Sequence, residues 1–490
     1  MEKKEIFASR WGIIFAGLGM ALGTGNIWRF PRIISQQGGG AFIIPWILFL
    51  FIWSLPLLII EMSIGKKTRS GVIGSFGKMI GKKFAWMGTF VAFVTTAIMF
   101  YYSVVTGWCM KYFLATSFQG LIKKDSIEFW RSFTSSWEPI FFHFLAITVG
   151  GIIIYFGVVK GIEKANKILI PCLFLLLIIA AIKALTLPSA AQGLNFLFNP
   201  NFTKLADYKV WLNALTQSAW SSGAGWGLLL TYSVYSHKKQ NPLLTASTLG
   251  FGDYVASLLA AVAVIPTVFS FFVGQSFTQE KVLDVMKADN QGLTFIWIPK
   301  LFANIPAGSL FLALFFLALC FAAFTSLISM LELVTRILMD AGLTRKKSVV
   351  WVTTIGFFFG LPSAISIGFF NNQDWVWGLG LMMSGFFFTL LVLKTGPKEF
   401  RLNVISTQDC KIKLGRWVDI VIIVLLPLQF VAMLFWWLWQ SYSSNPKNWL
   451  GIFSSSSVGT VLFQWIIALV IFILLNNLIT KKMGIKNYGN

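Results

Sequence analysis

The chain has 490 residues, of which 56% are hydrophobic and 12% are charged. Soluble globular domains carry about 25% charged residues, so this composition excludes an ordinary soluble fold and indicates an all-α polytopic membrane protein. The net charge of +22 would suit a nucleic-acid surface, but most Lys and Arg lie at the termini and between apolar runs, so no nucleic-acid partner is expected.

Twelve apolar runs are long enough to cross a bilayer as helices. They occupy residues 11–36, 41–65, 84–117, 140–158, 165–186, 210–236, 243–273, 307–338, 348–368, 375–394, 416–441 and 457–480. No soluble domain separates them, so residues 1–490 are expected to form a single transmembrane domain. Basic residues concentrate at both termini and in every second connection, which places both termini in the cytoplasm by the positive-inside rule. Short tails and short outer connections favour a bacterial inner (plasma) membrane.

The first and sixth runs are interrupted by glycines in mid-membrane. Residues 19–26 read Gly-Met-Ala-Leu-Gly-Thr-Gly-Asn, and residues 221–227 read Ser-Ser-Gly-Ala-Gly-Trp-Gly. A helix that unwinds inside the bilayer exposes amides and carbonyls that lipid cannot satisfy, so these groups must line a cavity or bind a ligand. Two such breaks, one in each half of a bundle, are typical of the substrate and ion site of a secondary transporter.

The matching breaks also predict an inverted repeat. Spans one to five, within residues 1–186, and spans six to ten, within residues 210–394, each begin with an interrupted helix, and residues 416–480 add two helices. Two other classes of membrane protein fit less well. A channel would need a continuous polar pore, and a membrane enzyme would need a nucleophile–base pair or a metal cluster within the spans.

The segment that contains the first break carries the most specific motif. Residues 21–31 read Ala-Leu-Gly-Thr-Gly-Asn-Ile-Trp-Arg-Phe-Pro, and residues 38–42 read Gly-Gly-Gly-Ala-Phe. With Glu61, Tyr102 and Lys-Gly-Ile-Glu-Lys at residues 160–164, they make the chain resemble the neurotransmitter:sodium symporter family, in its bacterial amino-acid-transporter branch of the leucine-transporter (LeuT) type. The resemblance covers nearly the whole chain. It implies the twelve-helix LeuT fold and sodium-coupled symport by alternating access.

The resemblance further implies two sodium sites made of oxygen ligands, which hard cations prefer. Sodium site 1 would use Ala21, Asn26, Ser221, Asp253 and the substrate carboxylate. Sodium site 2 would use the carbonyls of Gly19, Leu22 and Ala322 with the hydroxyls of Thr325 and Ser326. By themselves, two adjacent hydroxyl residues in a helix more often bond to their own helix, so this second assignment depends on the resemblance.

Asp253 lies inside an apolar span, where a carboxylate is costly and therefore indicates function. Chloride-dependent relatives have asparagine here and bind chloride through a tyrosine, at a position where this chain has Trp46. We therefore expect chloride-independent transport, although Ser257 matches the chloride-dependent pattern. A protonated Asp253, and with it proton coupling, is the alternative. The other acids in spans, Glu61 and Glu332, are expected to accept hydrogen bonds from amides of the unwound segments.

The amides of Thr24 and Gly25 lie at a half-helix N-terminus, which favours an anionic substrate group. Gly23 stands where monoamine carriers have aspartate, so an amino acid is expected. The resemblance implies the substrate contacts Met20, Ala21, Thr24, Gly25, Ile98, Tyr102, Trp220, Ser221, Gly223, Trp226, Ser326 and Met330. Because none of these side chains carries a charge at neutral pH, we expect a neutral amino acid, hydrophobic or aromatic. A small one resembling glycine or alanine is the alternative.

The resemblance also implies an outer and an inner gate. Arg29 and Asp374 would form the outer charge pair. Lys4, with Asp340 and Tyr235 as partners, would form the inner gate, where the family has arginine. Lysine cannot make arginine's bidentate contact, so this gate would be looser or would use Arg10 instead. The expected partners are thus a neutral amino acid, about two sodium ions and the lipid bilayer; the sequence leaves the oligomeric state open.

Overall fold

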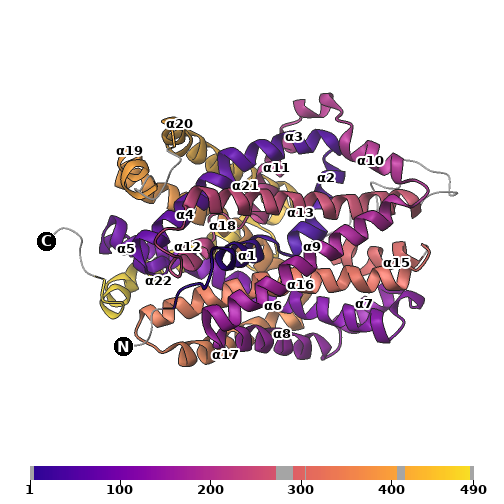
Figure 1. Cartoon of the computed structure of the whole chain (residues 1–490), viewed down its shortest axis with the longest axis horizontal. Coiled ribbons are helices and arrows are strands. Elements are labelled where there is room, and N and C mark those ends of the chain that lie inside the picture. The colour runs from indigo at the N-terminus through magenta and orange to yellow at the C-terminus, as the bar shows by residue number, and fades with distance from the viewer. Residues whose placement is uncertain (1–4, 272–290, 304, 406–413, 486–490) are drawn as a thin grey trace.

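The computed structural model describes residues 5–271, 291–303, 305–405 and 414–485. Every regular element in these ranges is helical (Figure 1). Among the described residues, ten helices are long and apolar enough to cross a membrane. Two further crossings are each split by a break, so the expectation of twelve crossings with the first and sixth unwound is confirmed.

The split crossings run through the interior. The first consists of α1 (Arg10–Ala21), the wide turn η1 (Gly25–Arg29) and α2 (Phe30–Gln36). The sixth consists of α11 (Tyr208–Ser221) and α12 (Leu228–Ser233).

The other crossings are continuous or bend through wide turns. They are α3 (Gly40–Phe49) with η2 (Leu50–Ser54) and α4 (Leu55–Thr68), α6 (Ala85–Phe118), α8 (Glu138–Tyr155), η5 (Val158–Glu163) with α9 (Lys164–Leu185), α13 (Pro242–Phe271), α16 (Gly308–Asp340), α17 (Arg345–Ile365), α18 (Ile367–Thr395), α20 (Trp417–Ile420) with η9 (Val421–Leu425) and α21 (Leu426–Ser444), and α22 (Val458–Lys482). Short helices connect them: α5 (Val72–Ile80), η3 (Lys82–Phe84), η4 (Leu121–Lys123), α7 (Ser126–Thr134), α10 (Ala190–Phe198), η6 (Phe202–Ala206), η7 (Gly292–Trp297) with α15 (Ile298–Ala303), α19 (Pro397–Phe400) with η8 (Arg401–Ile405), and η10 (Pro446–Asn448).

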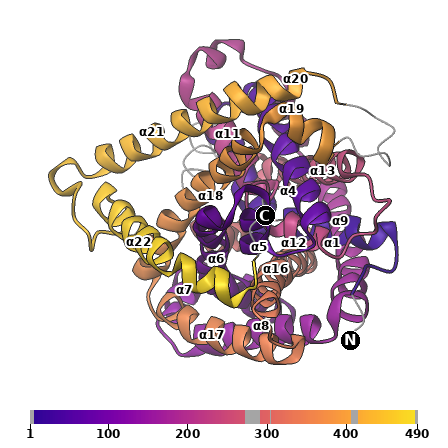
Figure 2. The same ribbon diagram turned by 90° about the vertical axis from the view of Figure 1, so that its left-hand side faces the viewer.

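The bundle has two ends. We call the end with α5, the start of α1 and the close of α22 the terminal end, at the left of Figure 1, and the end with α7, α10 and α15 the opposite end. In Figure 2, which looks onto the terminal end, α6 and α12 lie inside, whereas α17, α21 and α22 lie at the periphery.

Burial explains this arrangement. The long helix α6 packs against α16, α8 and α18 and is apolar nearly all round, as a buried helix must be. In contrast, α21 and α22 leave large apolar side chains uncovered, among them Phe435 and Leu474 at 69% and 76% exposure. Exposed apolar surface of this extent is typical of helices that face lipid. The core therefore surrounds the two split crossings.

Candidate functional site

The first break separates α1 from η1. The Leu22 amide still donates to the Leu18 carbonyl at 2.7 Å, but the Gly23 amide turns back to Ala21 at 2.9 Å, so the regular helical ladder ends there. The chain continues as a wide turn, a form that often occurs at functional sites. A Cβ atom at Gly19 would lie 2.1 Å from the Asn166 side chain of α9, so only glycine allows this approach.

The second break joins α11 to α12 through Gly223, Gly225 and Gly227. Their φ angles are +69°, +88° and +78°, in the left-handed region that favours glycine. The Glu61 carboxylate of α4 accepts from the amides of Gly225 at 2.6 Å and Leu230 at 3.2 Å. The predicted role of Glu61 is therefore confirmed.

The residues assigned to sodium site 1 meet around Asp253 of α13, which is fully buried. One carboxylate oxygen accepts from the Asn26 amide at 2.5 Å and the other from the Ser221 hydroxyl at 2.9 Å. The same Asn26 nitrogen lies 2.8 Å from the Ser257 hydroxyl. Ala21, at the end of α1, presents its carbonyl at the same break.

No Lys or Arg in the described part of the chain forms an ion pair with Asp253. A buried carboxylate without a counter-charge is costly, so this position suits a bound cation or a proton. The described residues contain no group of three or more His, Cys, Asp and Glu side chains that could hold a metal. Carbonyl, hydroxyl and single-carboxylate oxygens are instead the donors that a hard monovalent cation accepts.

The residues assigned to sodium site 2 lie where α16 crosses the end of α1. The Ser326 hydroxyl donates to the Gly19 carbonyl at 3.3 Å, and the Thr325 hydroxyl donates to Ala322 at 3.0 Å. Leu22, the remaining predicted ligand, is buried at the end of the same unwound segment. The Ser326 hydroxyl thus contacts the free carbonyl end of α1, whereas the Thr325 hydroxyl bonds to its own helix.

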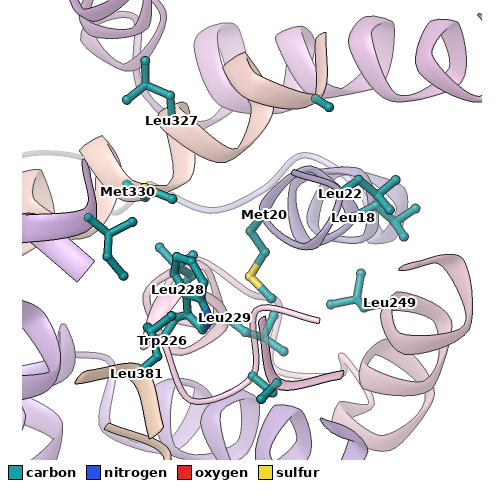
Figure 3. Close-up of a cluster of buried hydrophobic side chains, with 14 of the residues drawn as sticks. Leu18, Met20, Leu22, Trp226, Leu228, Leu229, Leu249, Leu327, Met330 and Leu381 are labelled. Carbon is teal, nitrogen blue, oxygen red and sulfur yellow. The ribbon is translucent and has the colours of Figure 1, made fainter. Parts of the chain in front are cut away.

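A cavity of about 230 Å³ lies between the two breaks. Its wall includes these predicted substrate contacts: Met20, Ala21, Thr24, Gly25, Tyr102, Trp220, Ser221, Trp226, Ser326 and Met330. The Thr24 amide donates to the Tyr102 hydroxyl at 3.0 Å. Figure 3 shows the Met20 side chain extending from the end of α1 toward Leu229 and Trp226.

Two predicted substrate contacts lie away from the cavity wall. Ile98 is fully buried in α6, and Gly223 lies behind Met20, whose Cε atom would be 3.5 Å from a Cβ added there. The cavity has a further wall residue that sequence reasoning did not single out, Gln217 of α11. Neither polar side-chain atom of Gln217 has a hydrogen-bond partner among the described residues. The sequence signal that could have identified Gln217 is an amide side chain inside an apolar span, one helical turn before Ser221.

The cavity continues toward the opposite end, where Arg29 and Asp374 both lie on its wall. These two described side chains do not form an ion pair with each other. The Arg29 guanidinium instead lies 4.9 Å from the centre of the Trp220 ring. Trp220 in turn makes an edge contact with Trp226 at 5.9 Å. The predicted outer pair therefore shares one cavity but stays separated.

The terminal end is closed by an ion network around Arg345 of α17. Its guanidinium makes two hydrogen bonds to the Glu332 carboxylate, at 2.7 and 2.8 Å, and two to one oxygen of Glu5, at 2.5 and 2.9 Å. The Tyr235 hydroxyl donates to Glu332 at 2.6 Å. Burial raises the pKa of Glu5, and the charge of Arg345 partly offsets that shift.

This network differs from the predicted inner gate. Glu332 bonds to Tyr235 and Arg345 and not to the amides of an unwound segment, so that prediction is wrong. Asp340 bonds to Arg336 and to the Gly71 amide. Lys4 lies outside the described residues.

A second contact fastens the start of α1 to η5. The Glu163 carboxylate accepts from the Ala8 amide at 2.7 Å and from the Ser9 hydroxyl at 3.1 Å. The Phe7 amide donates to the Tyr235 carbonyl at 3.1 Å. Arg10, the alternative gate cation, is exposed. Together these contacts hold the first crossing shut at the terminal end.

Comparison with known proteins gives consistent matches. The profile of the sodium:neurotransmitter symporter family matches residues 4–134 and 138–483. A sodium-dependent transporter of Methanocaldococcus jannaschii is 34% identical over 366 residues, which cover 72% of this chain and 73% of that protein. The sodium-dependent transporter YhdH of Bacillus subtilis is 30% identical over 407 residues, which cover 78% and 86%. The crystal structure of MhsT in complex with L-phenylalanine matches with a TM-score of 0.77 and 28% identity, covering 88% of this chain and 99% of that one.

Proposed function

Since the chain belongs to the sodium:neurotransmitter symporter family, a family of transporters and not of enzymes, we propose that it imports neutral, hydrophobic or aromatic L-amino acids together with sodium. Transport would proceed by alternating access and without chloride. The observation that carries this proposal is the cavity between the two breaks, together with Asp253, which is buried, bonds to the wall residues Asn26 and Ser221, and has no cationic partner among the described residues.

The chemistry of the cavity wall supports an amino-acid substrate. Thr24, Gly25 and Tyr102 supply a half-helix N-terminus and a phenol, which suit a carboxylate. Met20, Trp226 and Met330 supply an apolar surface, which suits an uncharged substrate side chain; the charged wall residues Arg29 and Asp374 lie farther toward the opposite end. The bound L-phenylalanine in the MhsT complex agrees with this assignment.

The ion assignment is two sodium ions, one at each of the two sites defined above. The fixed charge of Asp253 would take the electrostatic place of chloride. Trp46 supports this part of the proposal, because it offers no hydroxyl to an anion and its ring stacks on Tyr254 at 3.8 Å. The Tyr254 hydroxyl is occupied by the Trp46 carbonyl at 2.9 Å and the Ser218 hydroxyl at 2.7 Å.

The proposal also assigns each end of the bundle to one side of the membrane. The terminal end would face the cytoplasm of a bacterial inner membrane, as the distribution of basic residues predicts. Arg29 and Asp374 would approach each other when the opposite end closes. The division into repeats at residues 1–186 and 210–394 stays a prediction.

Reconstitution into liposomes tests these assignments. We expect uptake of labelled L-phenylalanine or L-leucine to require an inward sodium gradient and to persist when gluconate replaces chloride. Uptake that is unchanged when potassium replaces sodium, and that follows an imposed pH gradient, would establish the proton-coupled alternative. Preference for glycine or alanine over L-phenylalanine would contradict the assignment of substrate size.

A further inference from the structure

A second cavity, of about 930 Å³, opens at the terminal end, outside the transport site. Basic side chains dominate its wall: Arg69, His237, Lys238, Lys239, Arg336 and Arg345. Glu5 is the one acidic side chain that the described residues contribute to it. The walls come from the end of α4, the segment after α12, the last turns of α16 and the start of the chain. A cavity with this excess of positive charge attracts anions.

Part of this charge has no counter-charge among the described residues. Arg69 donates to the carbonyls of Val234 at 3.0 Å and Ser236 at 2.5 Å, and no carboxylate of the described chain pairs with it. Burial lowers the pKa of Arg69. Arg336 pairs with Asp340 on one side, but its Nε atom is buried and has no acceptor among the described residues.

The two lysines add mobile charge at the mouth of the cavity. Lys238 and Lys239 are both exposed and lie in the segment after α12. Lysine acts on phosphate as a point charge, whereas the arginine fork adds directed hydrogen bonds. The guanidinium groups of Arg69 and Arg336 are partly buried, and the buried Arg345 is already paired with Glu332 and Glu5, whereas the two ammonium groups lie nearer to solvent.

From this arrangement, we propose that the terminal cavity binds a phosphate-type oxyanion. Its source would be either the headgroup of an anionic lipid or a soluble phosphate compound. The ligand would complete the bonding of Arg336 and balance the charge of Arg69. Because the walls come from the residue that ends α4, the segment after α12 and the last turns of α16, the ligand would also link these segments in the closed arrangement of the terminal end. This inference is independent of the proposed substrate and ions.

Thermal unfolding of the purified full chain tests the proposal. We expect inorganic phosphate, compared with chloride at equal ionic strength, to raise the unfolding temperature of the wild type in a saturable way. The double variant Lys238→Gln/Lys239→Gln should need at least about tenfold more phosphate for half the effect, because two charge-assisted contacts are lost. Arg336→Lys, which keeps the charge but removes Nε, should also need more phosphate for half the effect.

The matched control is Lys346→Gln/Lys347→Gln. These adjacent exposed lysines follow Arg345 but do not line the cavity, and their replacement removes the same charge. The control should respond to phosphate as the wild type does. Equal weakening in both double variants would show a general charge effect and overturn the proposal. The absence of saturable stabilisation by both phosphate and anionic lipid would also overturn it.

The source of the anion is decided in nanodiscs. If the ligand is a lipid headgroup, phosphatidylglycerol should stabilise the wild type over phosphatidylcholine, and Lys238→Gln/Lys239→Gln should abolish the difference. If the ligand is soluble, phosphate should stabilise the protein equally in both lipids. Stabilisation by L-phenylalanine with sodium, measured in the same samples, reports on the transport site separately. Its failure would refute the proposed function and leave this result unaffected.

Discussion

The two ends of the transport path are built differently. At the terminal end, Arg345 makes bidentate contact with Glu332 and a further contact with Glu5, and Tyr235 completes the cluster. At the opposite end, Arg29 lies over the Trp220 ring and is not paired with Asp374 in the described structure. Buried ion pairs repay their desolvation only with good geometry and therefore fix a particular arrangement. The protein is thus held closed at the terminal end, while its cavity extends toward the opposite end.

The largest effect is expected from Glu332→Gln. This change leaves Glu5 as the one charged partner of the buried Arg345 among the described residues, and the loss of one partner of a buried pair costs about 3–5 kcal/mol. Hydrogen exchange should show protection of the Phe7 and Ala8 amides falling by more than about a hundredfold. Glu399→Gln is the control, because Glu399 is exposed at the start of α19 and the loss of its charge should matter by under about 1 kcal/mol. Unchanged protection in Glu332→Gln would refute the closing role of the network.

A somewhat smaller effect is expected from Asp253→Asn. The shape is kept but the charge is lost, so sodium activation of uptake should weaken by about 30-fold or more, in line with charged contacts of about 2–3 kcal/mol. Asp207→Asn is the matched control, since Asp207 caps α11 through the Lys209 amide at 2.9 Å and is exposed. Normal sodium activation in Asp253→Asn would remove the basis of sodium site 1.

Thr325→Ala tests the second site. Removal of a single hydroxyl ligand should raise the half-saturating sodium concentration about tenfold, since a hydrogen bond or contact to a charged group contributes about 1.5 kcal/mol. Thr325→Ser restores the hydroxyl and should recover most of the activation. If both variants respond to sodium as the wild type does, Thr325 is not a ligand.

The smallest effect is expected from Arg29→Lys. Lysine keeps the charge that would pair with Asp374. It loses only the cation–π contact of the planar guanidinium with the Trp220 ring, which contributes about 0.5–1 kcal/mol. Uptake should therefore fall by about two- to fivefold. A loss of a hundredfold would show that the opposite end needs the arginine fork, and the contrast between the two ends would then be smaller than the structure indicates.

The parts of the site that could be predicted from sequence are those fixed by backbone chemistry. The glycine clusters at residues 19–26 and 221–227 indicated the breaks because exposed peptide groups cannot face lipid. Glu61 was predicted to accept from freed amides, and it does.

The terminal network was not predictable in the same way. Arg345 belongs to the run Arg-Lys-Lys at residues 345–347, which has the same pattern as any basic connection. Glu332 lies 13 residues before Arg345 and meets it through the packing of α16 against α17, whereas Glu5 lies 340 residues away, in the segment before α1. Ile98 shows the same limit, since helical periodicity does not tell which side of α6 lines the cavity.

The bonds of Glu61 have a mechanical consequence. This one carboxylate holds two amides of the unwound stretch at 2.6 and 3.2 Å, so α4 and the start of α12 are tied at a point where neither can slide without breaking both bonds. A rearrangement that keeps both bonds therefore moves α4, the glycine segment at Gly225 and the start of α12 as one rigid unit.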